Sequence, residues 1–254
     1  MTPDEPKLHF SLPPITEAIL AFNFSAPLEK RWLEKVPTKL KKEYELKAPL
    51  KNYSVSIEQS PTGEDKSSIK IEELGLRLAS KDQTNILQIS QNFITFHRLA
   101  PYIDWEYLRT SAQNGLETLD KLAGVTPINK LSTRYLNRID IPFEDLEKRS
   151  ITFERYFALY STLPPAFESM ANVYNAWSRA FDDVQQGYRY VINFSPAPPA
   201  ILDHHSFSLD IEVTSIGEIP SKRSDLWAFV EKFRSEKNKA FLSCLTQETI
   251  GLFK

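Results

Sequence analysis

Apolar positions divide the first half of the chain into strand-like and helix-like stretches. Ile15–Phe24 (ITEAILAFNF) follows Pro13 and Pro14 and carries apolar residues on both parities, which is typical of a strand buried on most of both faces. Four more extended runs, joined by turn-like separators, cover residues 53–59, 69–79, 85–90 and 93–98. The pattern therefore predicts a central strand followed by an antiparallel meander.

Helical spacing predicts a long helix in each half of the chain. Asp104 is a suitable cap for a helix that ends near Gly124, and apolar residues recur behind it at steps of three and four. A second helix is predicted over residues 223–245, with a stripe formed by Leu226, Val230, Phe233, Phe241, Cys244 and Leu245. A shorter charged helix is expected after Pro27, with a break or kink at Pro37.

The second half contains three predicted strands, over residues 131–141, 188–194 and 207–213, and two predicted helical stretches, over residues 143–160 and 166–181. Both halves then follow one order: strand, helix, antiparallel strands, long helix. The sequence predicts an α+β fold in which residues 1–125 and 126–254 form two similar halves of an antiparallel sheet. The halves are expected to share one continuous core, with the long helices packed on one sheet face.

Composition and charge narrow the class of protein. The 254 residues are 41% hydrophobic and 25% charged, as in ordinary globular domains, so extensive disorder is excluded. A net charge of -2 argues against binding of nucleic acid or of anionic lipid. The single cysteine, Cys244, cannot form an internal disulfide, and no segment has the pattern of a signal peptide or of a membrane span. We therefore expect a soluble cytoplasmic protein.

The candidate site lies on the strand over residues 131–141. Strand alternation places Arg134 and Arg138 on one face, about 13 Å apart, and Tyr135 and Asn137 on the other. Two arginines at this spacing can hold separate carboxylates or phosphates of a ligand. The structural alternative is a buried ion-pair network with acidic residues of neighbouring strands. Glu17, a lone charge in an apolar strand, is the obvious partner, and the sequence favours this alternative.

Other chemical signatures are weak. Asp210 and Glu212 share one face of a predicted strand and would suit acid–base catalysis or cation binding, but a solvated face or a pairing with Arg189 explains them more simply. Only 7 glycines are present, and the common phosphate-loop, hydrolase-elbow and zinc-protease motifs do not occur. The sequence predicts no catalytic residue, no metal site and no cofactor.

Two motifs carry a family resemblance. The opening Pro13-Pro14-Ile15-Thr16-Glu17-Ala18-Ile19 and the segment Thr133-Arg134-Tyr135-Leu136-Asn137-Arg138-Ile139-Asp140-Ile141-Pro142 are similar to those of a sporadically distributed family of uncharacterised prokaryotic proteins. The resemblance implies a stand-alone bacterial protein. Its patchy distribution points to mobile or defence-associated genes. It supplies no active site to transfer.

Three functional hypotheses remain open. The first is a non-catalytic binding module for a small anionic ligand, with a pocket between sheet and helices, anchored by Arg134 and Arg138 and lined by Tyr135 or Tyr190. The second is a module that docks a protein partner, and homodimerisation is left open. The third is a metal- or Arg-assisted hydrolase acting on an anionic substrate, which we rank last because no nucleophile and base stand at a recognisable spacing.

Overall fold

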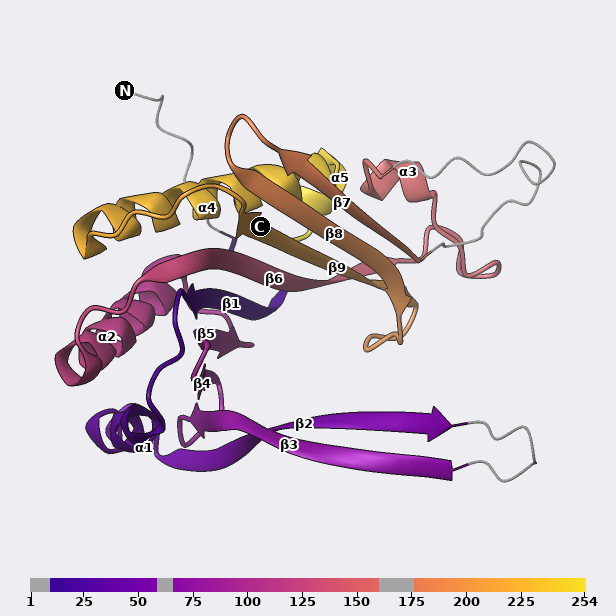
Figure 1. Ribbon diagram of the computed structural model, residues 1–254. Coiled ribbons are helices and arrows are strands. Elements are labelled where there is room, and N and C mark those ends of the chain that lie inside the picture. The colour runs from indigo at the N-terminus through magenta and orange to yellow at the C-terminus, as the bar shows by residue number, and fades with distance from the viewer. Residues whose placement is uncertain (1–9, 59–65, 160–175) are drawn as a thin grey trace. The chain divides into compact units, whose positions relative to one another are not determined.

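The computed structural model describes residues 10–58, 66–159 and 176–254. These residues form an α+β fold with a nine-stranded antiparallel sheet and five helices (Figure 1). The strands are β1 (Ile15–Phe24), β2 (Leu46–Glu58), β3 (Lys66–Ala79), β4 (Asn85–Ser90), β5 (Phe93–Leu99), β6 (Ile128–Pro142), β7 (Trp177–Asp183), β8 (Tyr188–Ala197) and β9 (His204–Ser215). The helices are α1 (Lys30–Lys39), α2 (Trp105–Ala123), α3 (Phe153–Tyr156), α4 (Arg223–Ser243) and α5 (Gln247–Gly251).

The strand order in the sheet is β2-β3-β4-β5-β1-β6-β9-β8-β7. The chain divides into two compact units. Of the described residues, the meander unit comprises 21–58, 66–98 and 105–129, and the C-terminal unit comprises 10–20, 99–104, 130–159 and 176–254. Strand β1 contributes to both units. None of the described helices has the length and apolar character needed to cross a membrane.

The meander unit confirms the predicted antiparallel meander, because β3 pairs with β2 and β4, and β4 pairs with β5. Helix α2 ends at Ala123, and Gly124 follows it with a φ of +80°, a conformation that glycine adopts at low cost. The helix approaches β5 closely: a Cβ atom on Gly115 would lie 2.3 Å from the ring of the buried Phe96. Of the break or kink predicted at Pro37, the break does not occur, because Pro37 lies inside α1, which continues to Lys39.

The C-terminal unit joins strands that are far apart in sequence. Strand β6 pairs antiparallel with β9, from Ser132 opposite Thr214 to Pro142 opposite His204, and β9 pairs with β8. Helix α4 packs on β9, as Figure 1 shows, with its apolar stripe buried. Aromatic rings fill this core: the ring centroid of Phe157 lies 5.1 Å from that of Phe194 and 5.0 Å from that of Phe207.

The first predicted helical stretch of the second half is wrong. Residues 143–159 contain only the short helix α3 and a turn closed by a bridge between Asp145 and Ser150. The carboxylate of Asp145 accepts the backbone N–H of Lys148 at 2.9 Å, and Arg149 has a φ of +50°. A short polar side chain that bonds nearby backbone in this way favours a turn over a helix.

The second predicted helical stretch is wrong where it can be compared. Residues 166–175 lie outside the described residues, and Trp177–Asp183 is the strand β7, paired antiparallel with β8. The hairpin turn between these strands includes Gly187 with a φ of +77°. Trp177 and Phe181 are four residues apart, a spacing that suits one face of a helix and one face of a strand equally, so the apolar pattern did not separate the two.

Candidate functional site

Strand β6 sends the predicted site residues to opposite sides of the sheet. Tyr135 is buried beneath α4, and the centroid of its ring lies 3.8 Å from Nζ of Lys237. Arg134 and Arg138 occupy the alternate positions, which are half-buried and point away from α4. Tyr135 and Asn137 therefore belong to the core beneath α4, and the two arginines belong to the other sheet face.

Arg134 is bound by a carboxylate of β9. Its Nε and Nη2 atoms donate to the two carboxylate oxygens of Asp210 at 2.8 and 2.6 Å, and Asn193 donates to the same carboxylate at 3.0 Å. The hydrogen bond to Asp210 is the main cause of the raised pKa of Arg134, and the charges of Glu212 and Glu17 raise this pKa further. Asp210 is thus a partner that the sequence analysis did not assign to Arg134.

Arg138 is held in a second network on the same face. Its Nε atom lies 3.1 and 3.2 Å from the two carboxylate oxygens of Asp140, and its Nη2 atom donates to the Pro198 carbonyl at 2.6 Å and to Ser206 Oγ at 2.8 Å. The hydroxyl of Ser206 donates in turn to Asp140. An incoming anion would have to compete with Asp140 here, and with Asp210 at Arg134.

Asn137 connects β6 to β9 through a side-chain hydrogen bond. Its buried Nδ2 atom donates to the carbonyl of Leu209 at 2.9 Å and to that of Tyr135 at 3.2 Å. The hydroxyl of Tyr135 lies 3.3 Å from the hydroxyl of Tyr102, and burial raises the pKa of Tyr135 far above its ordinary value. These hydrogen bonds satisfy buried polar groups, which would otherwise destabilise the fold. The role of Asn137 and Tyr135 is therefore structural.

Lys237 is a buried cation that sequence reasoning missed. Only 8% of its surface is exposed, and its Nζ atom donates to Asn238 Oδ1 at 2.6 Å. Its pKa is lowered from 10.5 to about 7, chiefly by burial and in addition by the nearby charge of Arg234. The sequence did indicate that Lys237 is buried. It lies one helical turn from both Phe233 and Phe241, at a position of the apolar stripe of α4 where an apolar residue is expected.

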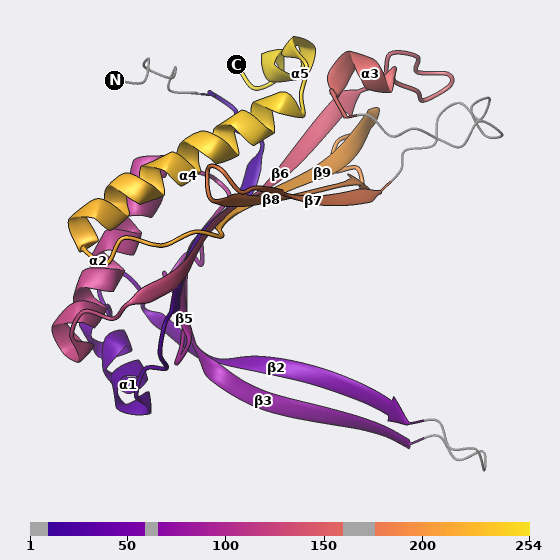
Figure 2. The same ribbon diagram turned by 45° about the horizontal axis from the view of Figure 1, so that its top comes forward.

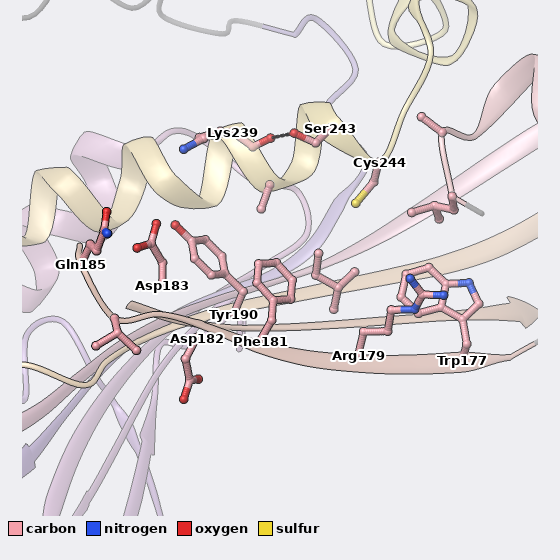
Figure 3. A pocket seen from close by; sticks show the side chains of 15 residues that line it. Trp177, Arg179, Phe181, Asp182, Asp183, Gln185, Tyr190, Lys239, Ser243 and Cys244 are labelled. Carbon is pink, nitrogen blue, oxygen red and sulfur yellow. Dashed lines mark hydrogen bonds between the residues drawn. The ribbon is translucent and has the colours of Figure 1, made fainter. Parts of the chain in front are cut away.

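A cavity of about 770 Å³ lies in the C-terminal unit, between α4 and the hairpin of β7 and β8 (Figure 3). This volume is within the range of small-molecule binding sites. Strands β7 and β8 contribute three aromatic side chains to the walls. Helix α4 contributes Lys239 and two small residues, Ala240 and Ser243. The apolar lining consists of Ala158, Leu159, Trp177, Phe181, Val184, Tyr190, Ile192, Ala240 and Cys244.

Charged groups of both signs border this cavity. Arg179 from β7 and Lys239 from α4 are among its lining residues, with Asp183 at the opposite end from Arg179 (Figure 3). The carboxylate of Asp182 is turned away from the cavity and is bound by Arg189 at 2.7 and 2.8 Å. Arg189 therefore pairs with Asp182, and the pairing with Asp210 or Glu212 considered from the sequence is not the one observed.

The cavity contains one of the two tyrosines that the sequence analysis placed in a pocket. Tyr190 lines it and donates its hydroxyl to Glu236 at 2.6 Å, whereas Tyr135 is not among the lining residues. Cys244, expected as a packed thiol, is buried in the wall, and burial raises its pKa to about 12. Trp177 was missed as a wall residue because its segment was predicted to be helical.

Within residues 10–58, 66–159 and 176–254, no group of three or more His, Cys, Asp or Glu side chains is placed to hold a metal ion. Comparison with models of known protein families gives no match for the chain, and neither does comparison with curated proteins. The resemblance carried by the segments 13–19 and 133–142 stays a prediction.

Proposed function

We propose that the protein is a non-catalytic binding module that holds a small aromatic or apolar molecule with an anionic group. The binding site is the cavity between α4 and the β7–β8 hairpin. The observation that carries this proposal is the aromatic wall of a cavity of about 770 Å³, formed by side chains that converge from two strands and a helix. This size and this largely apolar lining are typical of cavities that bind small molecules.

Exposed aromatic surface on β7 supports the proposal. The ring of Phe181 is stacked on that of Tyr190, with centroids 5.0 Å apart and an angle of 13° between the rings, yet Phe181 is 51% exposed. A ligand ring placed against Phe181 and Trp177 would remove apolar surface from water, which is the main source of affinity in such pockets.

Two cations at the cavity, Arg179 and Lys239, can contact an anionic group on the ligand. The side chain of Lys239 is 67% exposed, and its ammonium group lies 3.5 Å from a carboxylate oxygen of Glu236, with which an anionic ligand would compete. Arg179 lies with its guanidinium 5.5 Å from the centroid of the Trp177 ring. The proposal thus keeps the predicted ligand class and transfers the anion contact from Arg134 and Arg138 to Arg179 and Lys239.

The first test of the cavity uses 1-anilinonaphthalene-8-sulfonate, an aromatic sulfonate whose fluorescence rises in apolar sites. We expect the wild-type protein to bind the dye with a Kd in the micromolar range. The substitution Ala240→Trp should reduce this binding at least tenfold, because Ala240 lines the cavity and an indole there would fill it. The measurement is a fluorescence titration, accompanied by the dye-dependent shift in melting temperature.

The matched control for this test is Ala228→Trp, the same change at an exposed position of α4 that does not line the cavity. This variant should bind the dye as the wild type does. Equal dye binding by the wild type and Ala240→Trp, with both proteins folded by circular dichroism, would contradict the proposal. Equal loss in both tryptophan variants would do so as well.

Three finer predictions are kept with this proposal. We propose that the predicted halves, residues 1–125 and 126–254, are versions of one plan, since α2 follows a meander in the first and α4 follows antiparallel strands in the second. We also keep the cytoplasmic location and the link to mobile or defence genes as predictions. The hydrolase alternative gains no support, because Arg134 and Arg138 are each bound by a carboxylate of the chain.

A further inference from the structure

Strands β2 and β3 form a ribbon that extends beyond the rest of the meander. Strand β4 pairs with β3 only over Gly75–Ala79, whereas β2 pairs with β3 over the whole of Lys66–Ala79 apart from a bulge. The ribbon therefore comprises Lys51–Glu58 and Lys66–Glu73; Figure 1 shows it running past β4, and Figure 2 shows it extending beyond β5. An isolated two-stranded hairpin is at best marginally stable in water, so a partner surface would stabilise the part of the ribbon that extends beyond the sheet.

One face of this ribbon is apolar and exposed. Tyr53 lies opposite Ile71 in the register, and Ile69 is on the same face two residues further along β3. Their surfaces are 63%, 57% and 69% exposed for Tyr53, Ile71 and Ile69, respectively. The other face carries polar residues, including Ser54 opposite Lys70. An apolar cluster of this kind, with polar surroundings, marks an interaction site.

The charges at the base of the apolar face are self-complementary. Lys51 lies opposite Glu73 in the register, on the same face as Tyr53 and Ile71. If a two-fold axis runs along the ribbon, β2 of one copy faces β3 of the other. Each Lys51 then faces Glu73 of the second copy, and each Tyr53 faces Ile71 of the second copy. A symmetric contact needs such self-complementarity, because the same patch serves both subunits.

We propose that the apolar face of the β2–β3 ribbon is the contact surface of a homodimer, in which two ribbons pack face to face with β2 of each copy over β3 of the other. The three apolar residues of both copies would bury on the order of 800 Å² together, below the about 1,200 Å² at which stable interfaces begin. The dimer is therefore expected to dissociate on dilution. This inference is independent of the ligand-binding proposal.

The test is sedimentation velocity over a wide range of protein concentration. The wild type should change from monomer to dimer as the concentration rises. Ile71→Lys should stay monomeric, because it would place a charge in the dry centre of the contact. The matched control is Ser54→Lys, which adds the same charge to the opposite face of the same ribbon and should dimerise as the wild type does.

A charge exchange tests the arrangement of the two ribbons. Tyr53→Lys and Ile71→Glu should each be monomeric alone, and an equimolar mixture should form a dimer because the introduced lysine faces the introduced glutamate across the two-fold axis. A wild type that remains monomeric at every concentration would overturn the proposal, as would equal disruption by Ser54→Lys. Failure of the mixture to associate would overturn the arrangement of β2 over β3.

Discussion

Replacing Lys237 by methionine is expected to stabilise the protein by about 4 kcal/mol more at pH 6 than at pH 10, because the buried ammonium is costly only while it is charged. The pKa of Lys237 is about 7 in the folded chain and 10.5 as an ordinary lysine. Below pH 7 the folded state must hold the buried charge, and the full cost is present. As the pH rises from 7 to 10.5, the folded chain has already lost the proton and the cost disappears.

The measurement is the free energy of unfolding of the wild type and of Lys237→Met from denaturant titrations at several pH values. Methionine matches the apolar stem of lysine in volume, so the contact with the ring of Tyr135 is retained. The matched control is Lys232→Met, an exposed lysine on the same helix, which should show no comparable trend with pH. A difference for Lys237→Met that stays constant from pH 6 to pH 10 would contradict the expectation.

Removing the guanidinium of Arg134 is expected to destabilise the protein by about 2 kcal/mol, because Arg134→Ala leaves the carboxylate of Asp210 with Asn193 alone. Only 10% of the Asp210 side chain is exposed, so water can replace the arginine poorly. Breaking a fully buried pair costs about 3 to 5 kcal/mol, and the exposure of 43% of the Arg134 side chain reduces that cost.

Arg189 provides a matched control, because it binds Asp182 with the same bidentate geometry but at an exposed position. Arg189→Ala should leave the melting temperature close to that of the wild type, since exposed pairs contribute little. Arg134→Ala should also retain binding of the aromatic sulfonate dye, because Arg134 points away from α4 and from the cavity. Loss of dye binding in a folded Arg134→Ala protein would return this arginine to the binding site.

The sequence predicted local elements well where boundaries and periodicity agreed. Strand β1 occupies Ile15–Phe24 as expected. Two prolines precede it, and its apolar residues at both odd and even positions indicate a strand that is buried on both faces. Strand β4 and helix α2 likewise follow their predicted spans within a residue. The stretch 143–159 was misjudged because short polar side chains redirected the backbone into a turn, an effect that apolar spacing does not report.

The candidate site was harder to predict because it depends on which strands are neighbours. Arg134 is 76 residues from Asp210 in sequence, and only the pairing of β6 with β9 brings them together. The cavity wall required β7, whose aromatic spacing fits a helix as well as a strand. Lys237 could have been found from the sequence, because a charge at an apolar position of a helical stripe is a local signal.

The bulge between Leu50 and Lys51 has an evolutionary consequence. Beyond it the described residues of the two strands pair only with each other, so the length of the strands can change without disturbing β4. The pleat nevertheless restricts that drift: inserting or deleting one residue in a strand would turn its apolar side chains to the opposite face. Homologues that keep the contact should therefore differ in ribbon length by an even number of residues in each strand. The same number of residues should be gained or lost in both strands.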